Sequence, residues 1–180
     1  MPDYTLVGLS GSLRQAATNR LLIREAARLF DPAEFIEGDL NLPLYDGDLE
    51  KADGIPEAVQ QLADQIAGAD AVIISTPEYN KGPSGVLKNA LDWVSRTEGN
   101  PWAGKPVAVM SAAAGRAGGE RAQSILRACL VAFRPRILQG PEMHLAGSSK
   151  EFDDAGRLTS DLYIETLQDL MDALRAEIQR

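Results

Sequence analysis

Short apolar runs that alternate with longer amphipathic segments are the feature of this sequence that most constrains its fold. The runs cover residues 4–9, 34–40, 70–76 and 105–111, and a fifth, short strand is expected within 136–145. Most of them are continuously apolar and end at Ser, Gly or Pro, which is typical of strands buried in a parallel sheet. Strands separated by helices in this way predict a doubly wound α/β sheet.

The segments between the runs carry apolar residues at helical spacing, and Pro56 suits the start of one of them. We expect one domain over residues 1–180: a flavodoxin-like, five-stranded parallel sheet of order 2-1-3-4-5 with helices on both faces. Residues 41–55 are the longest irregular stretch, either a functional surface loop or a long connection. The predicted helices carry Leu22, Ala26, Leu29 and Phe30; Val59, Leu62, Ala63 and Ile66; Leu87, Ala90, Leu91 and Val94; Ala122, Ile125, Leu126, Cys129 and Phe133; and, from Leu158 on, Tyr163, Leu167, Leu170, Leu174 and Ile178.

Composition excludes several classes of function. The one cysteine, Cys129, cannot form an internal disulfide, and with the one histidine, His144, it makes no zinc-binding spacing. The net charge of -8 disfavours nucleic acid and anionic membranes as partners. From Met1 on there is no basic segment before the first apolar run, and no later stretch has the length a bilayer requires, so we expect a mature, cytoplasmic protein.

Ligands of such sheets bind beyond the carboxyl ends of the strands, where the strand order reverses. The first loop there, residues 11–20, leads into a helix whose unpaired N–H groups and dipole suit a phosphate. Ser12 and Thr18 supply hydroxyl groups, Asn19 an amide and Arg14 a charge. The pattern matches neither a P-loop nor GxGxxG. The alternative is an ordinary turn with a helix cap and a solvated arginine.

The loop after the third strand, residues 76–85, combines a stiff Pro77 with the planar side chain of Tyr79. Glu78 and Asn80 add polar groups, so the loop suits a planar heterocycle better than a sugar. The alternative is a plain turn in which Tyr79 covers the edge of the core.

The loop after the fourth strand, residues 111–123, contains Gly115, Gly118 and Gly119. Glycines allow a positive φ and a close approach of the backbone to a ligand, although they also occur in turns for steric reasons alone. Arg121 and Arg127, in the following helix, are expected to be solvated or interfacial.

Together, these loops resemble the NADPH-dependent FMN reductase family of flavodoxin-like enzymes, which includes bacterial quinone, chromate and ferric reductases and azoreductases. PEYN with LKNALDW at this separation is highly specific, and the resemblance covers nearly the whole chain. The shared pieces are GSLR at 11–14 with Asn19, PEYN at 77–80 followed by GVLKNALDW at 85–93, GGERAQxxLR at 118–127 and, more weakly, FDDAG at 152–156.

The resemblance implies bound FMN and NADH or NADPH as the electron donor. It assigns the phosphate to the first loop, the isoalloxazine and ribityl to the second, and the polar edge of the ring to the third, where backbone amides reach it. The residues implied are Ser12, Arg14, Thr18 and Asn19 for the phosphate; Pro77, Glu78, Tyr79 and Asn80 for the ring and ribityl; and Ser111 and Gly115 for the polar edge.

Two departures from the family pattern are visible. Pro83 stands one place early, so that Ser84 precedes the LKNALDW helix and is expected to cap it and alter the loop path. Arg20 follows Asn19 where small or apolar residues are frequent, and would add charge to the phosphate site.

Because FMN carries the chemistry, no catalytic acid or base is expected. The hypothesis is a ping-pong cycle: the nicotinamide delivers hydride to flavin N5 and leaves, and a quinone, chromate, ferric complex or azo dye takes its place. Arg96 is a candidate contact for an anionic acceptor or for the dinucleotide phosphates, with a surface salt bridge as the alternative.

Other functions compatible with the fold are a flavodoxin that carries single electrons without oxidising nicotinamide, and an FMN reductase that releases free reduced flavin. A phosphorylated receiver domain is disfavoured, because it needs acidic residues after strands one and three. The resemblance also implies a homodimer or homotetramer with FMN near the interface. In that case the helix at 86–95 supplies the surface if Trp93 is exposed, whereas Trp93 otherwise belongs to the core.

Overall fold

The computed structural model describes residues 3–180 and confirms the predicted sheet. Its main path has the strand order β2-β1-β3-β4-β5, with every pair parallel. The expectation of a mature start at Met1 falls outside the described residues. The strands are β1 (Thr5–Ser10), β2 (Glu34–Gly38), β3 (Ala71–Thr76), β4 (Pro106–Ala112) and β5 (Arg136–Ile137).

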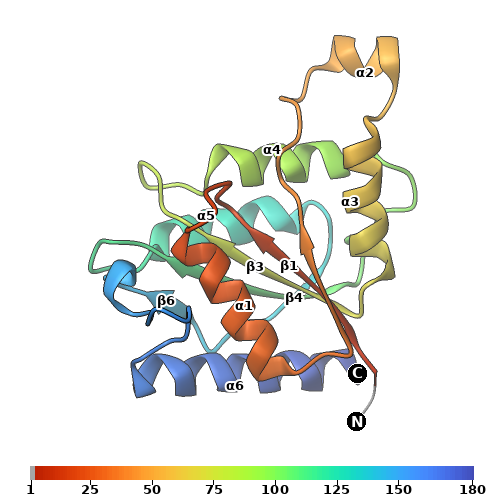
Figure 1. Ribbon diagram of the computed structural model, residues 1–180. Helices are drawn as coiled ribbons and strands as arrows, with labels where there is room; N and C mark the ends of the chain where they lie inside the picture. Colours follow the sequence, from red (N-terminus) through yellow and green to blue (C-terminus); the bar gives the residue numbers. More distant parts are fainter. Residues whose placement is uncertain (1–2) are drawn as a thin grey trace.

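Helices cover both faces of the sheet (Figure 1). Side chains of α1 and α6 form one buried cluster with the sheet, and those of α3, α4 and α5 form another on the opposite face. Within residues 3–180, no helix combines the length and the apolar character needed to cross a membrane. The helices are α1 (Thr18–Phe30), α2 (Gly47–Asp53), α3 (Glu57–Gly68), α4 (Gly85–Val94), α5 (Glu120–Val131), the short 3-10 helix η1 (Ser148–Lys150) and α6 (Asp161–Ile178).

The predicted fifth strand is two strands. β5 pairs with the start of β4, and β6 (Met143–Leu145) pairs with its end, through Met110↔Met143 and Ala112↔Leu145. Residues 138–142, which contain Pro141, separate them; proline has no N–H to donate to a sheet ladder. β6 therefore extends this edge of the sheet toward the carboxyl end of β4.

The helix after β4 differs in two positions from the predicted pattern. Ile125 lies on the solvent side, with 45% of its surface exposed, whereas Gln123 is buried instead. Phe133 follows the end of α5 and lies in the turn that leads to β5. Gln123 is buried because its amide donates to Ser111 Oγ (3.0 Å) and Met143 O (2.7 Å), contacts that helical periodicity does not reveal.

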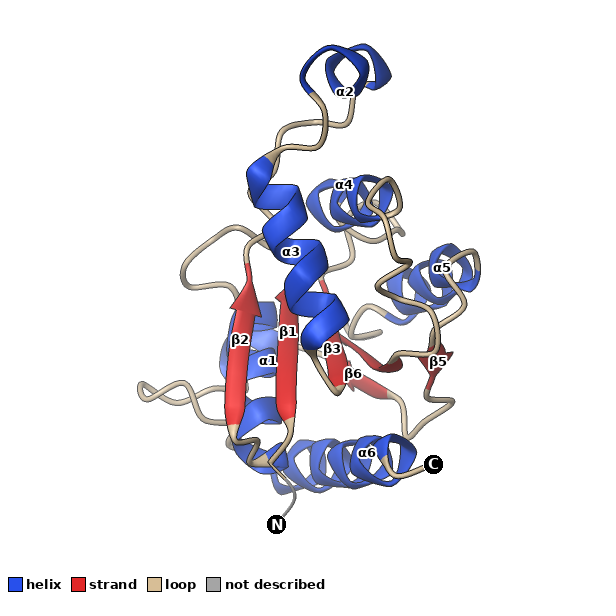
Figure 2. Cartoon of the chain, turned by 90° about the vertical axis from the view of Figure 1, so that its right-hand side faces the viewer, coloured by secondary structure: helices blue, strands red, loops and turns tan. Residues whose placement is uncertain are grey.

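Residues 41–55 are not wholly irregular, since they contain α2, none of whose residues is buried. Figures 1 and 2 show α2 beyond α3 and α4, away from the sheet. The segment is anchored on α4, where Trp93 Nε1 and Asn89 Nδ2 both donate to Pro43 O (2.7 and 2.9 Å). Trp93 is fully buried, so the prediction of an exposed Trp93 is wrong and its core alternative holds.

Candidate functional site

A cavity of about 530 Å³ opens at the carboxyl ends of β1, β3 and β4, the edge of the sheet where a site was predicted. Its volume falls within the range of about 300–1,000 Å³ that is usual for small-molecule sites. The loops after all three strands contribute to it, and residues 148–153 add a wall. The lining residues are Ser12, Arg14, Ala16, Ala17, Thr18, Asn19, Leu21, Pro77, Glu78, Tyr79, Ala112, Ala113, Ala114, Ser148, Ser149, Phe152 and Asp153.

The amino end of α1 faces this cavity without a side-chain cap. Ala17 occupies the N-cap position and has no side-chain hydrogen bond to give, which leaves the first N–H groups of the helix unpaired by a cap. Arg14 is exposed and forms no ion pair within residues 3–180. Ser12 is buried, and its Oγ accepts from Arg14 N (3.4 Å). The first loop thus offers uncapped amides and an unpaired cation.

Residues 148–153 form one wall of the cavity, and the sequence motifs include only part of this segment. Ser148 is buried, and its Oγ lies 3.0 Å from Thr18 Oγ1. Ser148 N donates to Ala113 O (3.1 Å), which ties this wall to the end of β4. Phe152 and Asp153 belong to FDDAG, so that motif was the signal for this wall, whereas nothing in the sequence marked Ser148.

A buried carboxylate forms hydrogen bonds with residues that follow this wall in the chain. Glu25, on α1, is 1% exposed and accepts from Arg157 Nη1 (2.7 Å) and from Arg28 Nε (3.0 Å). Burial raises the pKa of the Glu25 carboxyl, but the hydrogen bonds from Arg28 and Arg157 outweigh burial and hold this pKa below its usual value. Glu25 is therefore ionised at neutral pH.

Asn19 lies at the cavity, but its side chain is committed to the sheet. Its Oδ1 accepts from Ser75 Oγ (2.8 Å) and Ala112 N (3.0 Å), and its Nδ2 donates to Ala112 O (3.0 Å). The amide thus joins α1 to the ends of β3 and β4 across buried surroundings. It positions the loops, whereas the expectation was a direct amide contact with phosphate.

The loop after β3 is a tight turn around Asn80 and Lys81. Their φ angles are 50° and 72°, and Tyr79 and Gly82 exchange two backbone hydrogen bonds (2.9 and 3.1 Å). Two successive left-handed residues define a type I′ turn, for which Asn is well suited. Asn80 shapes this turn and does not line the cavity, whereas Tyr79 lines it with 53% of its surface exposed.

Glu78 lines the cavity and also contacts the beginning of α5. Its Oε2 accepts from Ala122 N (3.4 Å), and its Oε1 lies 3.8 Å from Arg121 Nη1. A carboxylate beside a helix amino end is favourable because of the helix dipole. Glu78 therefore connects the loop after β3 to the helix after β4.

Ser111 and Gly115 do not line the cavity. Ser111 is fully buried, and its Oγ donates to Gly118 O (2.6 Å). Gly118 and Gly119 have φ angles of 58° and 92°, and a Cβ on Gly118 would lie 2.6 Å from His144 O. Gly118 thus leaves room for the β6 backbone, and a Cβ on Gly119 would lie 2.7 Å from Ser111 Cβ, so the steric alternative holds for both glycines. Gly115 is exposed and a Cβ there would meet nothing.

Gly11 and Ser84 bring the first and second loops together. A Cβ on Gly11 would lie 2.9 Å from Pro77 Cδ and 3.0 Å from Ser84 Oγ. Ser84 is the N-cap of α4 and accepts from Leu87 N (3.4 Å), which confirms the predicted capping. Glycine at position 11 therefore allows the close contact between the loops that encloses the cavity.

Two other arginines lie outside the cavity. Arg96 Nε pairs with both carboxylate oxygens of Glu50 at 3.1 Å, which is the surface salt bridge held as its alternative. Arg20 Nε lies 2.5 Å from Glu37 Oε1, so the expectation that Arg20 adds charge to a phosphate site is wrong. Each of these two arginines thus forms an ion pair with a carboxylate that is distant in the sequence.

Comparison with known proteins identifies the family. The family model described as NADPH-dependent FMN reductase matches residues 4–149. The chain is 42% identical over 180 residues to an NAD(P)H-dependent FMN reductase of Pseudomonas aeruginosa, covering 99% of this chain and 97% of that protein. It is 41% identical over 141 residues to a quinone reductase of Escherichia coli, covering 76% and 74% of the two chains.

A solved structure shows the same fold. FerB, a flavoenzyme NAD(P)H:(acceptor) oxidoreductase of Paracoccus denitrificans, superposes with a TM-score of 0.88 at 33% identity, covering 98% of this chain and 97% of that one. The chain therefore belongs to the NADPH-dependent FMN reductase family, and it is an oxidoreductase that uses FMN and a reduced nicotinamide.

Proposed function

We propose that this protein transfers electrons from NADH or NADPH to quinones and to other small acceptors, including chromate and ferric complexes, with FMN held in the cavity at the carboxyl ends of the strands. The observation that carries the proposal is the unpaired Arg14 beside the uncapped amino end of α1, facing an open cavity. Relatives named FMN reductase and quinone reductase support the same reading.

The residues of the cavity fit FMN. A phosphate satisfies the N–H groups that Ala17 leaves uncapped, and Arg14 neutralises its charge. The hydroxyl groups of Ser12 and Thr18 add donors on the same side. Tyr79 and Pro77 supply an apolar border for the ring, while Glu78 lines the cavity beside them.

Other predicted residues hold the loops of the site in place and do not contact the cofactor in this proposal. Asn19 braces the loop ends, Asn80 forms the turn that presents Tyr79, and Ser111 holds Gly118. When bound, FMN would supply the redox chemistry, and the proposed cycle is ping-pong, in which the nicotinamide leaves before the acceptor enters. We place no catalytic acid or base on the protein, and Arg96 has no part in the site.

Titration with FMN and with riboflavin, which lacks the phosphate, tests the phosphate site. Replacing Arg14 with Gln should weaken FMN binding by roughly tenfold or more, because a charge-assisted hydrogen bond is lost. Riboflavin affinity should stay unchanged, as should FMN affinity in the exposed control R180Q. Equal losses for both flavins in R14Q would remove Arg14 from the phosphate site.

Steady-state kinetics and anaerobic reduction test the reductase activity. We expect NADH or NADPH to bleach the FMN-loaded protein within seconds, and double-reciprocal plots against a quinone to be parallel. An unbleached protein would instead be a flavodoxin-type carrier. Flavin that leaves the protein on reduction, detected by rapid ultrafiltration, would identify a supplier of free reduced flavin.

We also propose that the protein is a homodimer or homotetramer, with residues 41–55 in an interface, and that it works in the cytoplasm, where reduced nicotinamides are available. Leu44 is 82% exposed and Leu49 is 36% exposed on a segment that stands away from the sheet (Figure 2). Exposed apolar side chains on a protruding segment indicate a surface that is covered by a partner.

Light scattering tests this assembly. The change L44D should shift the protein toward monomer at micromolar concentration, because the interface would have to bury a carboxylate. The control D48N changes a side chain of α2 that is already polar, so it should leave the molar mass measured by light scattering unchanged. A wild-type protein that is monomeric at all accessible concentrations would contradict the proposal.

A further inference from the structure

Two hydroxyl groups from distant parts of the chain meet at the cavity where we propose that FMN binds. Thr18 Oγ1, at the beginning of α1, lies 3.0 Å from Ser148 Oγ, at the beginning of η1. Both residues line the cavity. Ser148 is 4% exposed, whereas Thr18 is half-buried. A buried hydroxyl group is costly unless it is hydrogen-bonded, and Thr18 supplies the partner of Ser148.

The end of β4 holds both of these residues in place. Asn19, next to Thr18, accepts from Ala112 N and donates to Ala112 O, both at 3.0 Å. Ser148 N donates to Ala113 O (3.1 Å). Consecutive residues at one strand end therefore fix the helix that carries Thr18 and the segment that carries Ser148. The contact between the two hydroxyl groups is thus set by the sheet.

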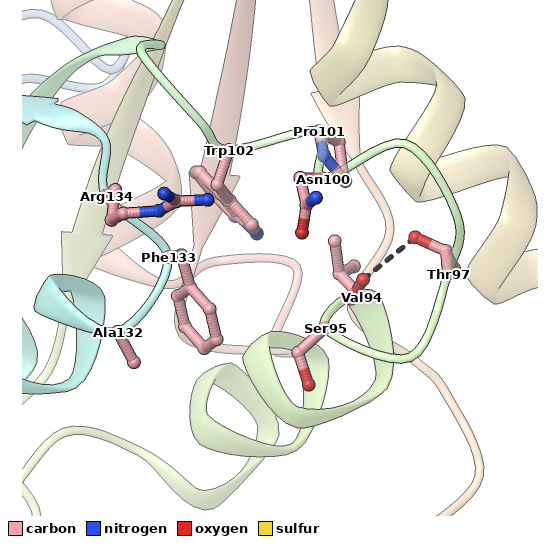
Figure 3. A pocket seen from close by; sticks show the side chains of 9 residues that line it. All are labelled: Val94, Ser95, Thr97, Asn100, Pro101, Trp102, Ala132, Phe133 and Arg134. Carbon is pink, nitrogen blue, oxygen red and sulfur yellow. Dashed lines mark hydrogen bonds between the residues drawn. The ribbon is translucent and has the colours of Figure 1, made fainter.

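This pair of hydroxyl groups has one proton more than its hydrogen bond uses. Each hydroxyl group carries one proton and two lone pairs, and a single bond joins the two groups. Within residues 3–180, neither hydroxyl group has another hydrogen-bond partner. By contrast, Thr97 Oγ1 donates its proton to the backbone oxygen of Val94 (2.8 Å), as Figure 3 shows. The remaining proton of the Thr18–Ser148 pair is therefore available to an acceptor in the cavity.

The position of Thr18 decides which of the two hydroxyl groups faces a bound phosphate. Thr18 is the first residue of α1 and directly follows Ala17, which leaves the helix without a side-chain cap. A phosphate at this helix end accepts hydrogen bonds, so Thr18 would donate to it. The lone pairs of Thr18 Oγ1 then remain free to accept from Ser148 Oγ. Hydrogen bonds that follow one another in this way strengthen each other.

We propose that Ser148 is a positioning residue of the phosphate site. Its hydroxyl group donates to Thr18 Oγ1 and thereby directs the proton of Thr18 to the phosphate of FMN. The inference rests on the proposed binding of FMN in this cavity. Riboflavin has no phosphate to accept this proton, so the pair favours FMN over riboflavin. It adds a directed donor to the charge of Arg14.

A double-mutant cycle tests whether Ser148 acts through Thr18. FMN and riboflavin are titrated into wild-type protein, S148A, T18V and the variant with both changes. Phosphorus NMR of bound FMN reports directly on the surroundings of the phosphate. S95A is the matched control, because Ser95 Oγ also donates within the protein, to Asp92 O (2.6 Å), and Ser95 does not line the cavity.

We expect T18V to weaken FMN binding by roughly tenfold, because a hydrogen bond to a charged group is lost, and S148A to weaken it by roughly threefold to tenfold. The two changes together should weaken FMN no more than T18V alone, since Ser148 acts through Thr18. S148A should also shift the phosphorus signal of bound FMN. Riboflavin affinity should stay unchanged in every variant, and S95A should change neither flavin.

If S148A does not fold, S148C replaces it, because its thiol has a similar shape but is a weak donor and should weaken FMN in the same way. Additive losses in the double variant, or a larger loss in S148A than in T18V, would show that Ser148 does not act through Thr18. Equal losses for both flavins in S148A would show a structural effect on residues 148–153. Each of these results overturns the inference and leaves FMN binding in place, whereas a wild-type protein that does not bind FMN would overturn the proposed function as well.

Discussion

At the scale of single residues, Glu25 is the clearest case of a side chain whose charge supports the site from a distance. It is nearly inaccessible to solvent, yet it joins Arg28 on its own helix to Arg157, which follows the 148–153 wall. Leu158 N also donates to it, at 3.4 Å. Because the folded-state pKa lies below the usual value, folding favours the ionised form.

The contribution of Glu25 to stability should therefore be present above the unfolded pKa, about 4.3, and be lost as the pH falls through the lower folded pKa. We expect E25Q to lower the free energy of unfolding at pH 7 by about 1–3 kcal/mol, because charged hydrogen bonds are lost. The deficit should shrink in acid. Urea denaturation at several pH values measures it, with the exposed E57Q as the control. A deficit independent of pH would show that the charge is unimportant.

Two of the predicted site residues make hydrogen bonds within the protein that their sequence motifs do not reveal. Asn19 and Ser111 are polar and lie in the loops that form the site, but their side chains are used internally. A sequence shows that a hydrogen-bonding group is present near a loop. It does not show whether a strand end far along the chain has already taken that group, as Ala112 does with Asn19.

At the scale of elements, the missing cap of α1 connects stability to binding. Ala17 has the extended backbone of an N-cap residue (φ −74°, ψ 132°), but its side chain cannot accept a hydrogen bond from the helix. A capping Asp there would satisfy the same N–H groups that we assign to the phosphate. Helix stability and flavin affinity should therefore change in opposite directions.

We expect A17D to stabilise the flavin-free protein by about 1 kcal/mol and to weaken FMN by tenfold or more, since a carboxylate would occupy the place of the phosphate. S160D is the matched control, because Ser160 is the N-cap of α6 and makes no side-chain cap bond either. It should stabilise the protein without affecting FMN. Thermal unfolding and flavin titration measure the two effects, and unchanged FMN affinity in A17D would contradict the assignment.

Element types followed from the sequence better than element ends. All residues of β3 and β4 are buried, and so are those of β1 after Thr5, as their apolarity predicted. The edge beside β4 was predicted as one strand and is two, and α2 was not predicted. α2 buries none of its residues, so it leaves no apolar periodicity to detect.

At the scale of the whole molecule, the cavity where we propose that FMN binds is lined by segments from both halves of the chain. Loops at 12–19, 77–79 and 112–114 meet residues 148–153, so a bound ligand contacts all four. A ligand that binds the folded state stabilises the entire fold by mass action. FMN should therefore act as a global stabiliser.

We expect FMN at 100 times its dissociation constant to raise the free energy of unfolding by about 2.7 kcal/mol. Removing FMN should lower the Tm, and adding it back should restore the Tm. Differential scanning calorimetry measures the effect, with riboflavin at the same concentration as a control that should stabilise less. A Tm that does not respond to FMN would show that FMN does not bind the folded protein.

The sequence by itself determined the order of strands and helices, the edge of the sheet where the cavity opens, and the loops that line this cavity, because apolar runs and turn residues act locally. Tertiary structure decided what each polar side chain does. Arg96 and Arg20 are paired with Glu50 and Glu37, whereas Arg14 forms no ion pair with any residue of 3–180. The hydrogen bonds from Trp93 and Asn89 to Pro43 O likewise form only once residues 41–55 are packed against α4. Such roles depend on contacts between residues far apart in the chain, which no local pattern records.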